Sequence, residues 1–349
     1  MTDAASRPAP PAPVSAVQAL ALEQGAPPPL EEVRHGVWSL AFPFGDGDYS
    51  LGYLIEGSDG ALTLIDPGWD DDANLDRLDA ALADVGHAME DISLVAVTHL
   101  HADHLGGADR VRRASGARLA LHAAEQRALD RRAAEALEAD ADIARWGAPA
   151  DDEEALVAAW GSGRRLPHVT ADLLLADGDE PPIAGRRLRA VHTPGHTAGH
   201  LCFVEPEQRL IVTGDHVLPR INPGIGLGGR TDANPLTDLL ASLERVIALD
   251  VAGADALEVC PGHEYRFVGL AERARALVDH RADRTADAAA ALDALAAEAQ
   301  RPTVWQVAER MSWTGGIASL HGYRLGSALA QTEWHVQALG RAGELRPSS

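Results

Sequence analysis

The stretch Thr98–Gly107, with the sequence THLHADHLGG, places three histidines and one aspartate within six positions. It directly follows the apolar run ISLVAV, which predicts a buried strand. His99 and His101 alternate along an extended chain, so both side chains point to one side, and Asp103 and His104 follow one turn later. Imidazole and carboxylate groups are ligands for zinc, iron and manganese, so this stretch favours a metal site over unrelated surface residues.

Two neighbouring metal positions need more ligands than one turn supplies, and later motifs supply them. HTPGHTAGH contains His192, His196 and His200, TGD ends in Asp215, and PGH ends in His263. Asp215 and His263 each follow an apolar run that predicts a strand, and each directly follows a glycine. Glycine lets the backbone approach a site closely, so these motifs are expected to meet at one edge of a sheet.

Composition excludes several classes of function. The net charge of −22 repels nucleic-acid phosphates and anionic membranes, so we expect a small-molecule substrate and neither a nucleic-acid nor a membrane partner. All 30 basic residues are arginine, and the missing lysine excludes Schiff-base and phosphate-loop NTPase chemistry. We interpret the two cysteines, Cys202 and Cys260, as buried thiols of a reducing compartment. With no signal-peptide pattern, the chain is predicted to be cytoplasmic, and a homodimer stays open.

The pattern along the chain divides it into three parts. Residues 1–30 are rich in proline and alanine and predict a disordered tail. Residues 31–267 alternate between strands and helices, with an alanine- and acid-rich helical insertion at about 123–165. Residues 268–349 are almost wholly helical. The strand–helix alternation in two halves predicts an α/β sandwich, with sheet packed on sheet and helices outside.

The motifs HxHxDH, PGHT, TGD and PGH, in this order, resemble those of the metallo-β-lactamase superfamily over about residues 35–265. Within it, HTPGHTAGH, TGDHVLP and PGHEY are most similar to glyoxalase II-like and related thioester or lactone hydrolases. The resemblance implies an αββα sandwich with its site along one edge. The C-terminal helices resemble the small winged-helix-like domain attached to some of these hydrolases.

The resemblance also implies two divalent metal ions, foremost Zn²⁺, with Fe or Mn as alternatives. The implied ligands are His99, His101 and His196 for the first ion, Asp103, His104 and His263 for the second, and Asp215 as the bridge between them. Asp66 in LIDPG would orient a ligand imidazole through its N–H group, or else simply form the turn before Pro67.

Such a pair of ions would share a hydroxide whose parent water has its pKa lowered from about 15.7 to near 7. The hydroxide would attack a thioester, lactone or related carbonyl, with Asp103 orienting it and later passing on a proton. Two alternatives remain open: a persulfide-dioxygenase-like enzyme with one iron on His99, His101 and Asp215, and a metal-dependent nuclease or phosphodiesterase. A non-enzymatic binding module is the last alternative.

Four residues near these motifs are candidates for substrate contact. His216 would face the substrate or cap its strand, and Arg220 would bind a carboxylate or phosphate or form a structural ion pair. Asn222 is expected near the mouth of the site. Tyr265 would lean on a polarised oxygen or pack in the core. The sequence YRF after GHE only partly matches the basic residues with which glyoxalase II recognises glutathione, so glutathione specificity is not predicted.

Three segments are expected to cover the site: the insertion, residues 216–229 and the C-terminal helices. Trp146 and Trp160 in the insertion would form an apolar wall or pack between helices. His192 and His200 are expected to make structural hydrogen bonds rather than to bind metal.

Overall fold

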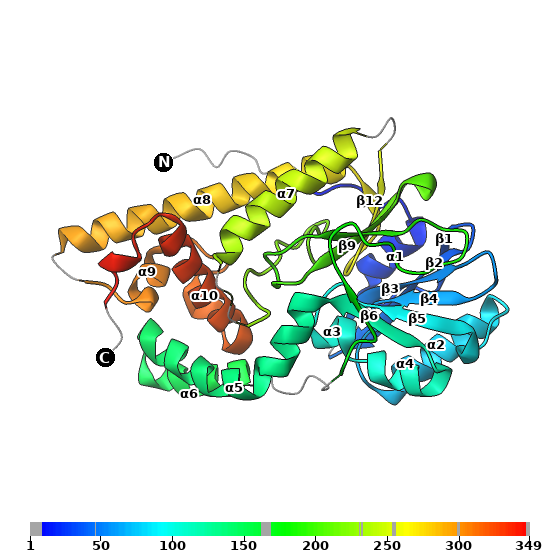
Figure 1. The fold of residues 1–349 in the computed structure, drawn as a ribbon. Coiled ribbons are helices and arrows are strands. Elements are labelled where there is room, and N and C mark those ends of the chain that lie inside the picture. Colours follow the sequence, from blue (N-terminus) through cyan, green and yellow to red (C-terminus); the bar gives the residue numbers. More distant parts are fainter. Residues whose placement is uncertain are drawn as a thin grey trace.

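Two β-sheets packed face to face form one half of the computed structural model, and a group of helices forms the other (Figure 1). The structure describes residues 9–45, 47–161, 169–229, 231, 233–252, 256–298 and 301–346. The first sheet contains, in spatial order, β1 (Glu31–Arg34), β2 (Val37–Phe44), β3 (Asp48–Glu56), β4 (Leu62–Ile65), β5 (Ile92–Ala96), β6 (Arg118–His122) and β7 (Leu173–Leu175). The second contains β12 (Phe267–Val268), β11 (Glu258–Pro261), β10 (Leu210–Gly214), β9 (Leu201–Glu205) and β8 (Arg189–His192).

Both sheets are mixed. Strands β1 to β4 pair antiparallel, and β4 to β7 pair parallel. In the second sheet β10 and β11 are parallel, and the other pairs are antiparallel. Parallel neighbours end at the same edge, so β5 and β10, which precede candidate ligands, each have a parallel partner beside them.

Alternating side chains divide each central strand between two cores. In β9, Leu201 and Phe203 point into the core between the sheets, whereas Cys202 and Val204 point to the outer helices. This period of two is what a strand buried on both faces requires. Cys202 and Cys260 are buried free thiols, as predicted, and burial raises the pKa of each to about 12.

Helices cover the outer face of each sheet (Figure 1). The first sheet packs against α2 (Asp72–Asp84) and α4 (Ala108–Ser115), and the second against α7 (Pro235–Ala252) and the beginning of α8 (Leu270–Ala297). Asp71 caps the N-terminus of α2, and its Oδ1 accepts a hydrogen bond of 2.7 Å from the Asn74 amide. The αββα prediction is therefore confirmed.

The insertion and the C-terminal helices share one apolar core. They comprise α5 (Ala123–Trp146), α6 (Ala150–Gly161), the end of α8, α9 (Val304–Arg310) and α10 (Gly322–Ala338), which we call the helical subdomain (Figure 1). Trp146 and Leu156 of the insertion pack with Leu325 and Leu329 of α10. The start of α8 packs in the core of the second sheet, and its end packs in the helical subdomain. The packing therefore continues across the domain boundary predicted at residue 268.

The short elements complete the chain. They are α1 (Ala16–Gln24), α3 (Ala102–Leu105) and the 3₁₀ turns η1 (Met89–Asp91), η3 (Pro206–Gln208), η4 (Ile317–Ser319) and η5 (Ala342–Glu344).

The N-terminal segment differs from the disordered tail expected for residues 1–30. The structure describes this segment from residue 9 onward. Ser15 caps the N-terminus of α1, and its hydroxyl accepts a hydrogen bond from the Gln18 amide. Gln18 is buried, and its side-chain oxygen accepts from the Arg266 amide at 2.8 Å. Pro13 forms a bridge to Phe267 of the edge strand β12. The segment is ordered because it supplies hydrogen bonds to an otherwise open sheet edge; residues 1–8 lie outside the described part.

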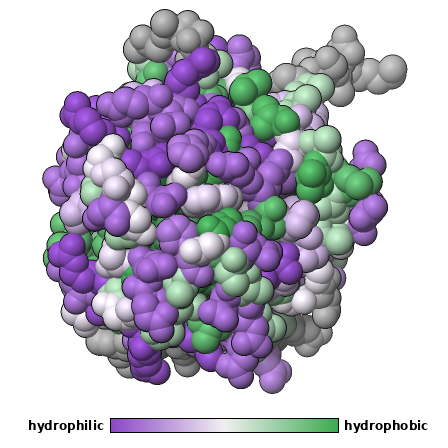
Figure 2. Space-filling view, turned by 90° about the vertical axis from the view of Figure 1, so that its right-hand side faces the viewer, coloured by the Kyte–Doolittle hydropathy of each residue, from purple (hydrophilic) through white to green (hydrophobic). Residues whose placement is uncertain are grey.

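The surface is mostly polar on the face seen in Figure 2, with small, interrupted apolar patches. This agrees with a chain that carries 52 acidic and 30 basic residues. Among the described residues, none of the helices combines the length and the apolar character that crossing a bilayer requires.

The contact between the insertion and the C-terminal helices can be tested by mutation. Glu333 of α10 is buried, accepts a hydrogen bond of 2.9 Å from Trp146 Nε1 and pairs with Arg145. Glu333→Ala leaves both donors without this partner, so we expect the free energy of unfolding to fall by about 2 kcal/mol. Urea denaturation followed by circular dichroism measures this. The exposed Glu309→Ala on α9 is the control, and equal losses in both variants would contradict the predicted role of Glu333.

Candidate metal centre

The predicted ligands come from four loops that end at one edge of the sandwich. His99 and His101 follow β5, and α3 continues the same loop. His196 lies between β8 and β9, Asp215 directly follows β10, and His263 follows β11. Residues separated by up to 164 positions in the chain are thereby brought together, and they form two adjacent clusters.

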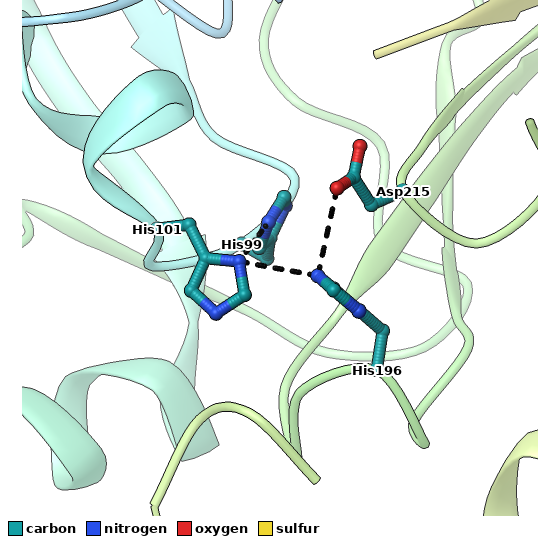
Figure 3. A group of neighbouring side chains, drawn as sticks. All are labelled: His99, His101, His196 and Asp215. Atoms are coloured by element: carbon teal, nitrogen blue, oxygen red, sulfur yellow. Dashed lines mark hydrogen bonds and ion pairs between the residues drawn. The ribbon is translucent and has the colours of Figure 1, made fainter. Parts of the chain in front are cut away.

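The first cluster consists of His99, His101, His196 and Asp215 (Figure 3). Nδ1 of His101 lies 2.9 Å from Nε2 of His99 and 3.1 Å from Nε2 of His196. His196 Nε2 in turn lies 3.6 Å from Oδ2 of Asp215. All four donor atoms therefore point at one common position.

The second cluster consists of Asp103, His104 and His263. The two Nε2 atoms of His104 and His263 are 3.4 Å apart. Oδ2 of Asp103 lies 3.3 Å from His263 Nε2 and 3.6 Å from His104 Nε2. This is again a ring of donor atoms around a single point.

Asp215 belongs to both clusters. Its Oδ2 faces the first, while its Oδ1 lies 3.3 Å from His263 Nε2 and 3.5 Å from His104 Nε2 in the second. Oδ1 is buried and has no hydrogen-bond partner among the described residues. A buried carboxylate oxygen without a donor is costly, and a cation on each side of Asp215 would satisfy it.

The spacing of the donors fits divalent cations. Four ligands at the 2.0–2.1 Å bonds of tetrahedral zinc are separated from one another by about 3.4 Å. The donor–donor distances given above, from 2.9 to 3.6 Å, bracket this value. The ligand types, imidazole and carboxylate, also suit iron and manganese.

The ring nitrogen of each histidine that faces away from its cluster is also held. Fixing that second nitrogen sets the tautomer and the plane of a ligand imidazole. The pairs are His99 Nδ1 with Thr98 Oγ1 (3.0 Å), His101 Nε2 with the Leu227 carbonyl (3.1 Å), His196 Nδ1 with the Gly224 carbonyl (2.8 Å), His104 Nδ1 with Asp66 Oδ2 (2.8 Å) and His263 Nδ1 with the Tyr49 carbonyl (2.8 Å).

Asp66 directly follows β4 and holds the loop after β5 at two places. It accepts hydrogen bonds of 2.7 Å from both the amide and the hydroxyl of Thr98, and a third from His104. Its φ of 54° is left-handed, a conformation that aspartate tolerates better than most residues. Its carboxylate thus ties β5 to α3, which goes beyond forming a turn before Pro67.

The two clusters differ in the pKa values of their histidines. Burial, together with neighbouring imidazoles, lowers the pKa of His99 well below its usual value and the pKa of His101 to about 3. Burial also works against protonation of His104, but the carboxylates of Asp103 and Asp215 outweigh it and raise its pKa to about 9. The same two carboxylates raise the pKa of His263 well above its usual value. Without metal, the second cluster therefore holds protons, and the first does not.

The four candidate substrate residues are either buried in the protein or held by other side chains. The Tyr265 hydroxyl donates to the Pro11 carbonyl, so it packs in the core and does not lean on a reacting oxygen. His216 is fully buried, with its ring 5.9 Å from that of His200, and so does not face a substrate. Asn222 is exposed, and its side-chain oxygen accepts from Arg273 at 3.0 Å. Arg220 forms an ion pair of 3.2 Å with Glu264, as in the structural alternative.

His192 and His200 make structural hydrogen bonds. His200 Nε2 accepts from the Asp215 amide at 3.2 Å, and its Nδ1 lies 2.9 Å from Thr193 Oγ1. His192 Nε2 lies 2.9 Å from the Ala198 carbonyl. Trp146 packs between helices, and the Trp160 side chain lies outside the described residues.

Glu125 is a positioning residue that the sequence pattern did not reveal. Its buried carboxylate accepts hydrogen bonds from the amides of Leu100, at 2.9 Å, and Gly199, at 2.5 Å. It therefore joins the HxH loop to the loop that carries His196. An acidic residue in the first turn of a helix is common for reasons of helix stability alone, so nothing in the sequence set it apart.

Comparison with known proteins agrees with this geometry. Residues 45–263 match the family model of the metallo-beta-lactamase superfamily. The hydroxyacylglutathione hydrolase of Cereibacter sphaeroides strain ATCC 17029 is 29% identical over 174 residues, covering 50% of this chain and 49% of that protein. The acyl-coenzyme A thioesterase MBLAC2 of Bos taurus is 29% identical over 178 residues, 50% of this chain and 57% of that protein. The chain thus spans about half the length of the curated relatives it matches.

Solved structures extend the similarity to the helical subdomain. A metallo-beta-lactamase family protein from Thermus thermophilus is 27% identical with a TM-score of 0.69, covering 89% of this chain and 95% of that one. A beta-lactamase domain protein from Burkholderia ambifaria is 25% identical with a TM-score of 0.65, covering 90% of each chain. Coverage of this extent reaches well beyond residues 45–263.

Gly262 offers a test of the shared ligand. A Cβ at this position would lie 2.7 Å from both Asp215 Oδ1 and His104 Cε1. Gly262→Ala should therefore displace both ligands and weaken cation binding about tenfold or more, measured by metal content after equilibration with a chelator. Gly343→Ala, where an added Cβ meets nothing within 4 Å, is the control. Unaltered binding in Gly262→Ala would contradict the predicted displacement of Asp215 and His104.

Proton release on metal binding tests the second cluster. His104 is protonated below its pKa of about 9 in the metal-free protein, so a cation must displace that proton. We expect release at pH 7 and its decline as the pH rises through about 9, together with tighter binding. Calorimetry in buffers of different ionisation enthalpy measures it. Asp66→Asn removes a carboxylate that raises this pKa and should shift the decline to lower pH; release that is independent of pH would contradict the assignment.

Proposed function

The chain belongs to the metallo-beta-lactamase superfamily, and we propose that it is a metal-dependent hydrolase that holds two divalent cations and cleaves a thioester, lactone or related carbonyl substrate. The observation that carries this proposal is the position of Asp215. One carboxylate oxygen faces three histidines and the other faces Asp103, His104 and His263. A site for one iron would not need the second cluster, so its presence favours hydrolysis over the dioxygenase alternative.

The protein would hold the first cation with His99, His101 and His196, the second with Asp103, His104 and His263, and both with Asp215. Bound cations would supply Lewis acidity, lowering the pKa of a shared water and polarising the substrate carbonyl. The remaining tasks fall to side chains of the protein.

Asp103 is the group in the site best placed to move a proton. Its side chain is 20% exposed, compared with 13% for Asp215 and none for His104, so its carboxylate lies at the open side of the second cluster. Burial would raise the pKa of Asp103, but His104 and His263 hold it well below its usual value. A carboxylate at this position can orient an attacking water and transfer its proton to the leaving group.

An aromatic pair adjoins the second cluster. Phe44 lies edge-on to His263 with ring centroids 6.1 Å apart, and Trp69 stacks on Phe44 at 5.9 Å. Trp69 is 41% exposed, unusual for so large an apolar side chain. We propose that this pair contacts an apolar part of the substrate, such as an acyl chain.

Thioesters are the first substrate class to test. The names of two relatives, a hydroxyacylglutathione hydrolase and an acyl-coenzyme A thioesterase, support this class. The half-exposed Arg220 is held by Glu264, so it does not offer a free cation to a strongly anionic carrier. We therefore propose a small-molecule thioester and place nucleic acids last, in line with the net charge of −22.

The proposal is tested by hydrolysis of a panel of thioesters, lactones and phosphodiesters with metal-loaded protein. We expect thioester or lactone turnover, and a fall in kcat of at least about 100-fold in Asp103→Ala. Metal content and circular dichroism are measured in parallel. Asp79→Ala, an exposed aspartate on α2, is the matched control.

Two outcomes would refute this function. One is full turnover by Asp103→Ala. The other is wild-type protein that carries two metal equivalents and hydrolyses nothing on the panel.

A further inference from the structure

We propose that Arg273 and Arg281 of α8 are positioning residues for the first cation, because they hold the loop whose backbone carbonyls orient His101 and His196. The loop comprises residues 216–229, and we call it the carbonyl loop. The inference rests on the metal site described above and does not depend on which substrate is cleaved.

The carbonyl loop contacts two ligand histidines through its backbone. The Gly224 carbonyl accepts from His196 Nδ1 at 2.8 Å, and the Leu227 carbonyl accepts from His101 Nε2 at 3.1 Å. The Leu227 amide returns a hydrogen bond of 2.8 Å to the His196 carbonyl. Two of the three histidines of the first cluster thus depend on this loop for their orientation.

The sequence of the carbonyl loop gives its backbone little stiffness with which to orient these histidines. Residues 223–229 read PGIGLGG, in which four of seven residues are glycine. Glycine has the largest backbone freedom to lose on folding, so this segment cannot hold its carbonyls in place by its own stiffness. Anchors from outside the segment must do so, and the side chain of Ile225, which is fully buried, assists them by packing in the core.

Two arginines of α8 supply these anchors. Arg273 donates to the Leu218 carbonyl at 2.7 Å and to the Ile221 carbonyl at 2.8 Å. Arg281 donates through Nη2 to the Pro223 carbonyl, one residue before Gly224. Because the peptide unit is planar, fixing the Pro223 carbonyl also fixes the amide of Gly224, whose own carbonyl orients His196.

Neither arginine is explained as an ordinary ion pair. Within the described part of the chain, no carboxylate lies within salt-bridge distance of Arg273 or Arg281. Arg281 is 2% exposed, and its second donor, Nη1, reaches Gln331 of α10 at 2.9 Å. Burying a guanidinium without a carboxylate partner costs free energy. Its role in holding the loop gives a reason for this cost. Arg281 therefore connects α8, α10 and the first cluster.

The test uses Arg273→Met and Arg281→Met in the full-length protein, with Arg284→Met as the matched control. Arg284 is also a buried arginine of α8, but it contacts Asp287 and the ring of Trp313, both of which lie outside the carbonyl loop. Methionine keeps the bulk of the side chain and removes its donors. All three variants are compared with wild type by thermal unfolding, which reports general destabilisation.

Cobalt(II)-substituted protein gives the decisive readout, because hyperfine-shifted imidazole N–H resonances report each ligand histidine separately. In the two clamp variants, Arg273→Met and Arg281→Met, the N–H protons of His101 and His196 should exchange faster with solvent, and first-site cobalt affinity should fall about tenfold. The N–H protons of His104 and His263, which Asp66 and Tyr49 hold, should not change and serve as internal references. Arg284→Met should leave all of them as in wild type.

Two results would overturn the proposal: unchanged exchange of His101 and His196 in both clamp variants, or equal changes in Arg284→Met. Hydrogen exchange of backbone amides 216–229 in metal-free protein distinguishes this failure from failure of the proposed function. If wild type takes up no cobalt, the metal assignment falls, and with it the positioning role. Faster amide exchange confined to the clamp variants would then show that the arginines hold the loop for another purpose.

Discussion

The structure depends on burying seven ionisable side chains at one edge of a sandwich without leaving their charges uncompensated. Asp215 is the centre of this problem, because its buried Oδ1 makes no hydrogen bond among the described residues and lies 3.3 Å from Nε2 of His263. A buried charge is costly unless an opposite charge or a cation compensates it. The strand ends, the outward-facing hydrogen bonds of the histidines and the left-handed backbone at Asp66 all serve to hold these groups where cations can compensate them.

Much of this arrangement could be predicted from the sequence. The HxHxDH, PGHT, TGD and PGH motifs led to the αββα sandwich and to the ligands that the structure brings together, because metal ligands must lie at strand ends and the motifs follow apolar runs. The hydrogen-bond partners of the outward-facing histidine nitrogens were harder to predict from the sequence. Three of the five partners are backbone carbonyls, of Tyr49, Gly224 and Leu227. Every residue has a backbone carbonyl, so the sequence does not distinguish the carbonyls that bind a histidine.

The points that the sequence did not decide have a common physical cause. For Tyr265 the sequence left substrate contact and core packing open, and for residues 9–30 it predicted disorder; the open edge of the second sheet decides both. The N-terminal segment closes the edge at β12, and the Tyr265 hydroxyl then finds the Pro11 carbonyl in place of a substrate. Likewise, Glu125 resembles any acidic residue at a helix start until folding brings the amides of Leu100 and Gly199 to it. Contacts between segments far apart in the chain decide the roles of these residues, and a single sequence does not reveal such contacts.

The core shared by the insertion and the C-terminal helices constrains how this chain can be shortened or altered. Trp146 and Leu156 have their apolar partners in α9 and α10, much later in the chain, so deleting either segment strips the other of its interior. A truncation at residue 268 would also remove the beginning of α8 and uncover Phe267 and Val259 on the second sheet. Engineering of this scaffold therefore has to treat the two distant segments as a single unit that is exchanged whole.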